Sequence, residues 1–112
     1  MNRKLIFISH PSSGDIEGNI NKVIKICKDW YTRGHIPIAP HLLFSYMDSD
    51  KERAWIMRVC YWLVMICPVF LSYGETAGCM EELILAERMG KQIIKMNDKT
   101  RGNADGLERE SG

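Results

Sequence analysis

Glu82 lies four residues after Gly78, at the start of a predicted helix that follows a loop of small residues. Helical side chains lean back toward the amino terminus, so the Glu82 carboxylate should point into the space in front of the first turn. Free backbone amides and the positive end of the helix dipole favour an anion or a hydroxyl-rich sugar there. We expect the dipole to keep Glu82 ionised, as a nucleophile requires. The spacing also fits a plain surface glutamate that the dipole favours in a first turn.

Two histidines in predicted loops are further candidates. His10 follows the first predicted strand and His41 follows the second. An imidazole titrates near neutral pH, so either side chain is able to hydrogen-bond a ligand or to donate a proton. Loop histidines also make structural hydrogen bonds or face solvent, and that alternative stays open for both.

The four cysteines stand singly, at positions 27, 60, 67 and 79. They form no C-x-x-C pair, and no histidine stands nearby at a metal-ligand spacing. We therefore expect no metal site, and nothing in the chain implies a cofactor.

Short apolar runs alternate with longer amphipathic segments along the chain. The runs predict strands at residues 5–8, 36–39, 69–73 and 92–96. Pro37 indicates that the second strand lies at an edge of the sheet, because proline cannot donate to a sheet ladder. Residues 40–44 are expected to form a loop.

Helix signals fill the spaces between these strands. The first helix is predicted between a cap at Asp15 and a left-handed stop at Gly34. The second is predicted from a capping box at Ser49–Glu52 to about Ile66, and the third from the loop at residues 74–78 to Gly90.

This order predicts one small three-layer α/β domain over residues 1–96, with a flavodoxin- or Rossmann-like sheet of four parallel strands in the order 2-1-3-4. In that order the chain reverses between strands 1 and 3, and ligands bind outside the carboxyl ends of the strands at such a reversal. The loops that meet there are Ser9 to Asp15 and Gly74 to Gly78. Residues 97–112 are polar and without periodicity, so we expect a flexible tail.

The composition narrows the classes of protein. The chain has 112 residues, of which 46% are hydrophobic, and a formal charge of +1. It fits one domain, and its near-neutral charge argues against a nucleic acid partner. The longest apolar run, residues 61–71, is shorter than the roughly 20 residues that cross a bilayer, and the apolar run after Lys4 is too short for the core of a secretory signal. We expect a cytoplasmic homo-oligomer without membrane contact, with Trp55 at the interface.

Several motifs occur in one order along residues 4–96. They are Ile8-Ser9-His10-Pro11 through Gly14-Asp15, then Asn19, then Gly34-His35-Ile36-Pro37-Ile38-Ala39-Pro40-His41-Leu42-Leu43-Phe44, then Gly78 with Glu82 and Ala86. In this order they resemble the nucleoside 2-deoxyribosyltransferase-like superfamily. They are most similar to a short, mostly uncharacterised phage and bacterial branch, to which the run from Gly34 is specific.

The resemblance implies hydrolysis of an N-glycosidic bond, or transfer of a ribosyl or deoxyribosyl group, with a nucleoside or nucleotide as substrate. The glutamate at the position of Glu82 would attack the anomeric carbon, and water or a second base would resolve the covalent intermediate. The first loop would line the pocket, with Thr76 and Gly78 near the sugar 5′ end. Our predicted substrate-binding residues are Ser9, His10, Ser12, Gly14, Asp15, His41, Tyr73, Thr76 and Gly78.

Two positions depart from the superfamily pattern. Relatives place an aspartate before the third strand to assist at the leaving base, where this chain reads Cys67-Pro68. They often carry a tyrosine in the first loop that orients the nucleophile, where this chain reads Ser12-Ser13; Tyr73 is a candidate to compensate. Three alternatives remain: an active glycosidase or transferase, a nucleotide-binding or sequestering protein without turnover, and a structural domain with a vestigial crevice.

Overall fold

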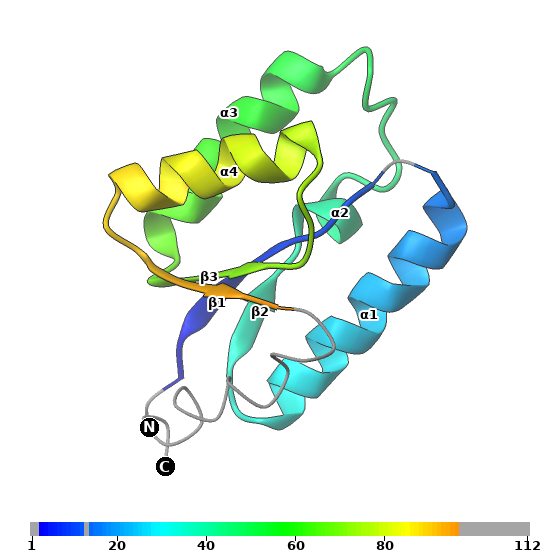
Figure 1. The fold of residues 1–112 in the computed structure, drawn as a ribbon. Helices are drawn as coiled ribbons and strands as arrows, with labels where there is room; N and C mark the ends of the chain where they lie inside the picture. Colours follow the sequence, from blue (N-terminus) through cyan, green and yellow to red (C-terminus); the bar gives the residue numbers. More distant parts are fainter. Residues whose placement is uncertain (1–2, 13, 97–112) are drawn as a thin grey trace.

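The computed structural model describes residues 3–12 and 14–96, so the predicted tail lies outside the described residues. The elements follow one another as β1 (Leu5–Ser9), α1 (Ile16–Thr32), β2 (Ile36–Ile38), α2 (Pro40–Leu43), α3 (Arg53–Ile66), β3 (Val69–Ser72), α4 (Ala77–Arg88) and β4 (Gln92–Lys95). Figure 1 shows the strands as a central layer between helices.

The four strands form one parallel sheet in the order β2-β1-β3-β4, which confirms the predicted topology. β1 lies in the interior of the sheet, where Phe7 pairs with Ile38 of β2 on one side and with Phe70 of β3 on the other. Pro37 lies in β2 at the edge, as predicted from its missing amide hydrogen.

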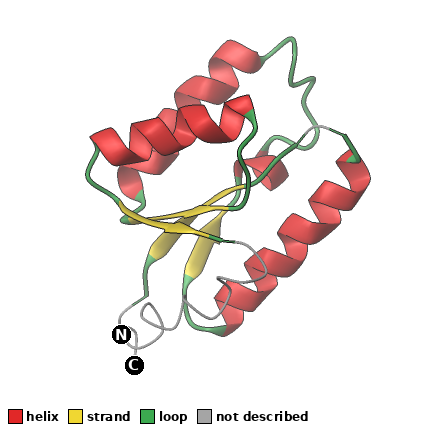
Figure 2. Ribbon diagram, viewed as in Figure 1, coloured by secondary structure: helices red, strands yellow, loops and turns green. Residues whose placement is uncertain are grey.

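Alternate residues of β1 serve the two faces of the sheet, because successive side chains of a strand point in opposite directions. Ile6 and Ile8 pack in one buried cluster with Val23 and Trp30 of α1. Phe7 packs in the other cluster, with residues of α3 and α4, and its ring stacks on Phe70 with centroids 5.2 Å apart. The continuous apolar run at residues 5–8 is therefore a strand covered on both faces (Figure 2).

The ends of α1 follow the predicted signals. The Asp15 side chain accepts a hydrogen bond from the Gly18 amide at 3.0 Å and so caps the first turn. Gly34 has a φ of +98°, a conformation that an L side chain rarely adopts, and it turns the chain into β2.

The predicted capping box at Ser49–Glu52 is wrong. Residues 49–52 form turns, α3 begins at Arg53, and its N-cap residue Glu52 makes no side-chain capping bond. Asp48, one position before Ser49, binds the free amides instead. Its carboxylate accepts a hydrogen bond from the Lys51 amide at 3.2 Å, and its carbonyl accepts one from the Glu52 amide at 3.0 Å.

The expected loop at residues 40–44 contains a short helix, α2, and the prediction is wrong there too. Pro40 occupies the first turn, where its fixed φ suits a helix and its missing amide hydrogen costs nothing. The Phe44 amide closes the turn on the Pro40 carbonyl at 2.9 Å. This turn holds His41 at the carboxyl end of β2.

Within residues 3–12 and 14–96, none of the helices has the length and apolar character that a membrane crossing requires.

Candidate functional site

A pocket of about 540 Å³ lies beyond the carboxyl ends of β1 and β3. Its lining comes from the segment after β1, from α1, from α2 and the loop that follows it, from the first half of α3, and from the start of α4. The volume lies in the range of small-molecule sites, about 300–1,000 Å³. The predicted reversal point of the sheet is thus the place where the chain forms a cavity.

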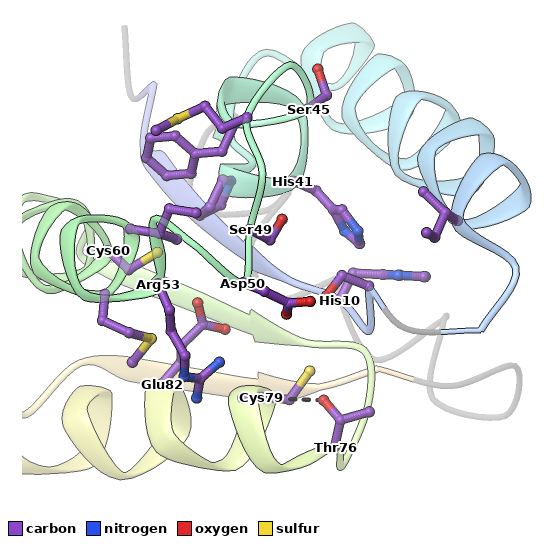
Figure 3. A pocket seen from close by; sticks show the side chains of 18 of the residues that line it. His10, His41, Ser45, Ser49, Asp50, Arg53, Cys60, Thr76, Cys79 and Glu82 are labelled. Carbon is purple, nitrogen blue, oxygen red and sulfur yellow. Dashed lines mark hydrogen bonds between the residues drawn. The ribbon is translucent and has the colours of Figure 1, made fainter.

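Glu82 lines this pocket from α4 (Figure 3). The Ser9 hydroxyl donates a hydrogen bond to Glu82 Oε1 at 2.7 Å, and Ser9 itself is buried at the last position of β1. The central strand of the sheet therefore fixes the orientation of the carboxyl group.

Burial raises the pKa of Glu82 to about 7, and hydrogen bonds from Ser9 and Cys60 oppose this rise only in part. The expectation that the helix dipole keeps Glu82 fully ionised is therefore wrong. Because α4 begins at Ala77, Glu82 lies beyond the first turn, where the effect of the helix dipole has fallen off, and removal of the carboxylate from water then dominates. Near pH 7, Glu82 is divided between its protonated and ionised forms.

His10 and His41 line the same pocket, and their ring centroids are 5.9 Å apart. His10 Nδ1 lies 2.9 Å from the Pro11 carbonyl oxygen, so the neutral ring carries its proton on Nδ1 and donates it to that oxygen. Burial, and then the charge of His10, lower the pKa of His41. Among the side chains that the structure describes, His41 Nε2 is the buried polar atom that lacks a hydrogen-bond partner.

The start of α4 contributes Thr76 and Gly78 to the lining. The Thr76 hydroxyl accepts a hydrogen bond from the Cys79 amide at 3.3 Å, so one of the amides expected to meet a ligand is used to cap the helix. A methyl group at Gly78 would meet no atom within 4 Å, which leaves room for a ligand oxygen close to the backbone.

Of the remaining predicted residues, some line the pocket and others lie outside it. Ser12 lines the pocket, and Ser9 contacts it through Glu82. Gly14 and Asp15 form the start of α1 and are not part of the lining. Tyr73 also lies outside it: its hydroxyl accepts a hydrogen bond from Trp30 Nε1 at 3.0 Å.

Six polar residues that the sequence reasoning did not select for the site line the pocket: Ser45, Asp48, Ser49, Asp50, Arg53 and Cys60. Arg53 carries a positive charge and reaches Glu81 at 3.5 Å. The sheet topology could have pointed to these residues, because the segment after any parallel strand, β2 included, begins at the carboxyl end of the sheet.

Cys67, at the position where the resemblance implies an aspartate, is 1% exposed and packs in the core with Val64 and Phe70. Within the described part of the chain, no group of three or more His, Cys, Asp or Glu side chains is arranged to hold a metal ion.

Two solved structures share this fold at low sequence identity. A 2-desoxiribosyltransferase from Leishmania mexicana has a TM-score of 0.66 and 14% identity, and the match covers 83% of this chain and 63% of that protein. The CMP N-glycosidase BcmB of Clostridium botulinum has a TM-score of 0.59 and 15% identity, and the match covers 96% of this chain and 81% of that protein. The chain thus spans less than two thirds of the Leishmania protein.

A comparison with curated proteins finds no match. A family model does match, over residues 4–96, and this range includes the whole sheet and every segment that lines the pocket. The chain belongs to the family described as Domain of unknown function (DUF7768).

Proposed function

We propose that this protein cleaves the N-glycosidic bond of a nucleoside or nucleotide, by hydrolysis or by (deoxy)ribosyl transfer, with Glu82 as the nucleophile. The observation that carries the proposal is a glutamate held by a buried serine inside a pocket of small-molecule size. The two fold neighbours, which are named as a deoxyribosyltransferase and a CMP N-glycosidase, support it.

The chemistry needs an oriented carboxylate. The ionised fraction of Glu82 attacks the anomeric carbon as the base departs, and a covalent glycosyl ester forms. Water, or a second base, then displaces Glu82 and restores the carboxylate. The hydrogen bond from Ser9 holds one carboxylate oxygen in place, so the attacking group reaches the sugar with little reorganisation.

A base-release assay tests this proposal. The wild type and Glu82→Gln are incubated with a panel of nucleosides, deoxynucleosides and their 5′-monophosphates, and free base is measured by chromatography. We expect release by the wild type and a loss of about 1,000-fold or more in the variant, because the amide cannot form the ester.

Glu87→Gln is the matched control, since Glu87 is an exposed glutamate on the same helix and outside the pocket. It should release base at the wild-type rate. Absence of release from every substrate by the wild type, or equal release by Glu82→Gln, would show that Glu82 is not a glycosidic nucleophile.

One observation favours a second candidate, a nucleotide-binding protein without turnover. With a pKa of about 7, much of Glu82 is protonated near neutral pH, and a protonated carboxyl group donates a hydrogen bond instead of attacking carbon. If this candidate is correct, calorimetry should detect binding of a nucleotide to the wild type, and the base-release assay should detect no free base.

We also propose that the protein forms a homo-oligomer through the outer face of α3. Trp55, Trp62 and Ile66 lie on this face, and each is at least 50% exposed. Exposed apolar side chains that gather on one face of a helix mark a surface that a partner covers. Together with Tyr61 and Met65, the face exposes apolar surface on the order of 500 Å². That area fits the centre of an interface with a second copy of this nearly neutral chain.

A further inference from the structure

Cleavage of an N-glycosidic bond leaves the bonding electron pair on the base, and a proton donor next to the base makes this departure easier. The following inference rests on the proposed function, and it concerns which side chain supplies that proton. The pocket contains a small set of groups that carry a transferable proton, so each can be considered in turn.

Most of these groups are poor donors by chemistry or position. Arg53 does not release its proton at any pH that the protein experiences, and it is paired with Glu81. Burial raises the pKa of the Cys60 thiol to about 12, which makes it a very weak acid. Asp48 and Asp50 lie on the exposed loop before α3, so their carboxyl groups face water.

His41 differs from these groups in having an unused polar atom at the pocket. Its Nε2 is buried, and it has no hydrogen-bond partner among residues 3–12 and 14–96. Buried polar atoms in folded proteins nearly always have a partner, so an unpartnered atom on a residue that lines a pocket points to a contact with a ligand. Pro40 anchors the turn of α2 that holds the ring in this position.

His10 complements His41 across 5.9 Å. Because its Nδ1 donates to the Pro11 carbonyl, its neutral ring presents a lone pair on Nε2 and accepts hydrogen bonds. The two rings therefore offer a donor and an acceptor side by side. Such a pair suits a heteroaromatic base that has both an acceptor and a donor on one edge.

We propose that His41 is a catalytic residue that donates the Nε2 proton to the departing base, while His10 accepts a hydrogen bond from the same base. In the first step the Glu82 oxygen forms a bond to the anomeric carbon, the C–N bond breaks, and its electron pair takes the proton from His41. In the second step His41 takes a proton from the attacking water, and the sugar–Glu82 bond breaks. The sum is nucleoside plus water giving free sugar plus base.

Leaving-group dependence tests this role. The best substrate of the base-release panel is compared with a 4-nitrophenyl glycoside of the same sugar, whose nitrophenolate leaves without a proton. His41→Gln keeps a hydrogen-bonding group near the Nε2 position but cannot give up a proton. We expect it to lose about 100- to 10,000-fold in kcat/KM on the nucleoside and less than 10-fold on the nitrophenyl glycoside.

Asp50→Asn is the matched control, because Asp50 is one of two acids on the loop before α3 that line the pocket. It should leave the ratio of the two rates unchanged. Equal losses of His41→Gln on both substrates, or a selective loss in Asp50→Asn instead, overturn the assignment. Cleavage of the nitrophenyl glycoside by His41→Gln also shows that this variant is folded.

The pH profile supplies a second readout that a structural role would not produce. The ionisable groups that share the pocket with His41 are His10, Asp48, Asp50, Arg53, Cys60, Cys79 and Glu82. Nucleoside cleavage by the wild type needs Glu82 ionised and His41 protonated, so it should decline on both sides of a narrow optimum near neutrality. In His41→Gln the alkaline decline should disappear, and its persistence would overturn the proposal. Failure of the wild type on both substrates would instead refute the proposed function itself, and this inference with it.

Discussion

Glu82 meets two requirements that oppose each other. Attack on a sugar needs a charged carboxylate, whereas its position in the pocket removes that charge from water and raises its pKa from 4.5 to about 7. A carboxyl group whose pKa is raised in the folded state contributes to stability below its unfolded pKa, and that contribution is lost as the pH rises through the folded value.

We therefore expect Glu82→Gln to stabilise the protein above pH 7. The gain in the free energy of unfolding should be on the order of 2 kcal/mol at pH 8 and close to zero at pH 4.5, since the amide removes the cost of burying a charge. Urea unfolding at the two pH values measures it, with the exposed Glu87→Gln as reference. An equal effect of Glu82→Gln at both pH values would contradict the raised pKa.

The sequence predicted the position of Glu82 better than its protonation state. Four-residue spacing from Gly78 is a local property, and it correctly predicted that Glu82 and Gly78 face the same crevice, since both line the pocket. The hydrogen bond from Ser9 joins residues 73 positions apart, and Cys60 of α3 also hydrogen-bonds to the carboxyl group. Neither contact follows from local spacing, so the balance between burial and dipole was misjudged.

At the scale of elements, a substitution at the start of α4 should have opposite effects on the stability of the fold and on ligand binding. Gly78 lies inside the helix, where a methyl group would meet no atom within 4 Å, and alanine is a better helix former than glycine. Gly78→Ala should leave the fold intact and raise its stability by up to about 1 kcal/mol. It should also weaken ligand binding about 10-fold or more if a sugar or phosphate oxygen approaches this backbone.

Thermal unfolding and calorimetric titration of the nucleotide that binds the wild type best measure the two effects in Gly78→Ala. The surface substitution Glu87→Gln again serves as reference. Unchanged affinity together with the expected gain in stability would mean that the ligand does not approach Gly78.

Elements with a clear apolar pattern were predicted well, and the segment between β2 and α3 was predicted poorly. The helices and strands of residues 5–38 and 53–95 carry enough periodic apolar residues to specify their type. The structure of the segment between them is decided by individual side chains. Pro40 favours a turn of helix, and Asp48 binds the amides that a cap at Ser49 would have used. Because this segment supplies His41, Asp50 and much of the pocket wall, the site was harder to predict than the sheet.

At the scale of the molecule, strand order and the location of the pocket followed from general rules of parallel sheets. The resemblance to nucleoside 2-deoxyribosyltransferases is supported at the level of fold by the two solved structures. Three statements stay predictions: the phage or bacterial branch, the cytoplasmic location and the oligomer. The fold of one chain does not determine its origin, its place in the cell or its association with other copies.

The proposed oligomer can be tested on the exposed face of α3. Trp62→Glu should shift sedimentation from an oligomer to a monomer at micromolar concentration, because it introduces a charge at the centre of the apolar face. Tyr46→Ser is the control, since Tyr46 is 84% exposed and lies outside α3. A wild type that sediments as a monomer up to about 100 μM would exclude this interface as a stable one.

The interior position of β1 also bears on how the chain matures. β1 is made first, yet its partners are β2 and, some sixty residues later, β3, with Phe7 opposite Phe70. Until β3 has emerged from the ribosome, the apolar strand at residues 5–8 has one uncovered edge, to which another nascent chain can add. Glu82 follows β3, so a truncated product has neither a complete sheet nor the candidate nucleophile, and it is prone to aggregate.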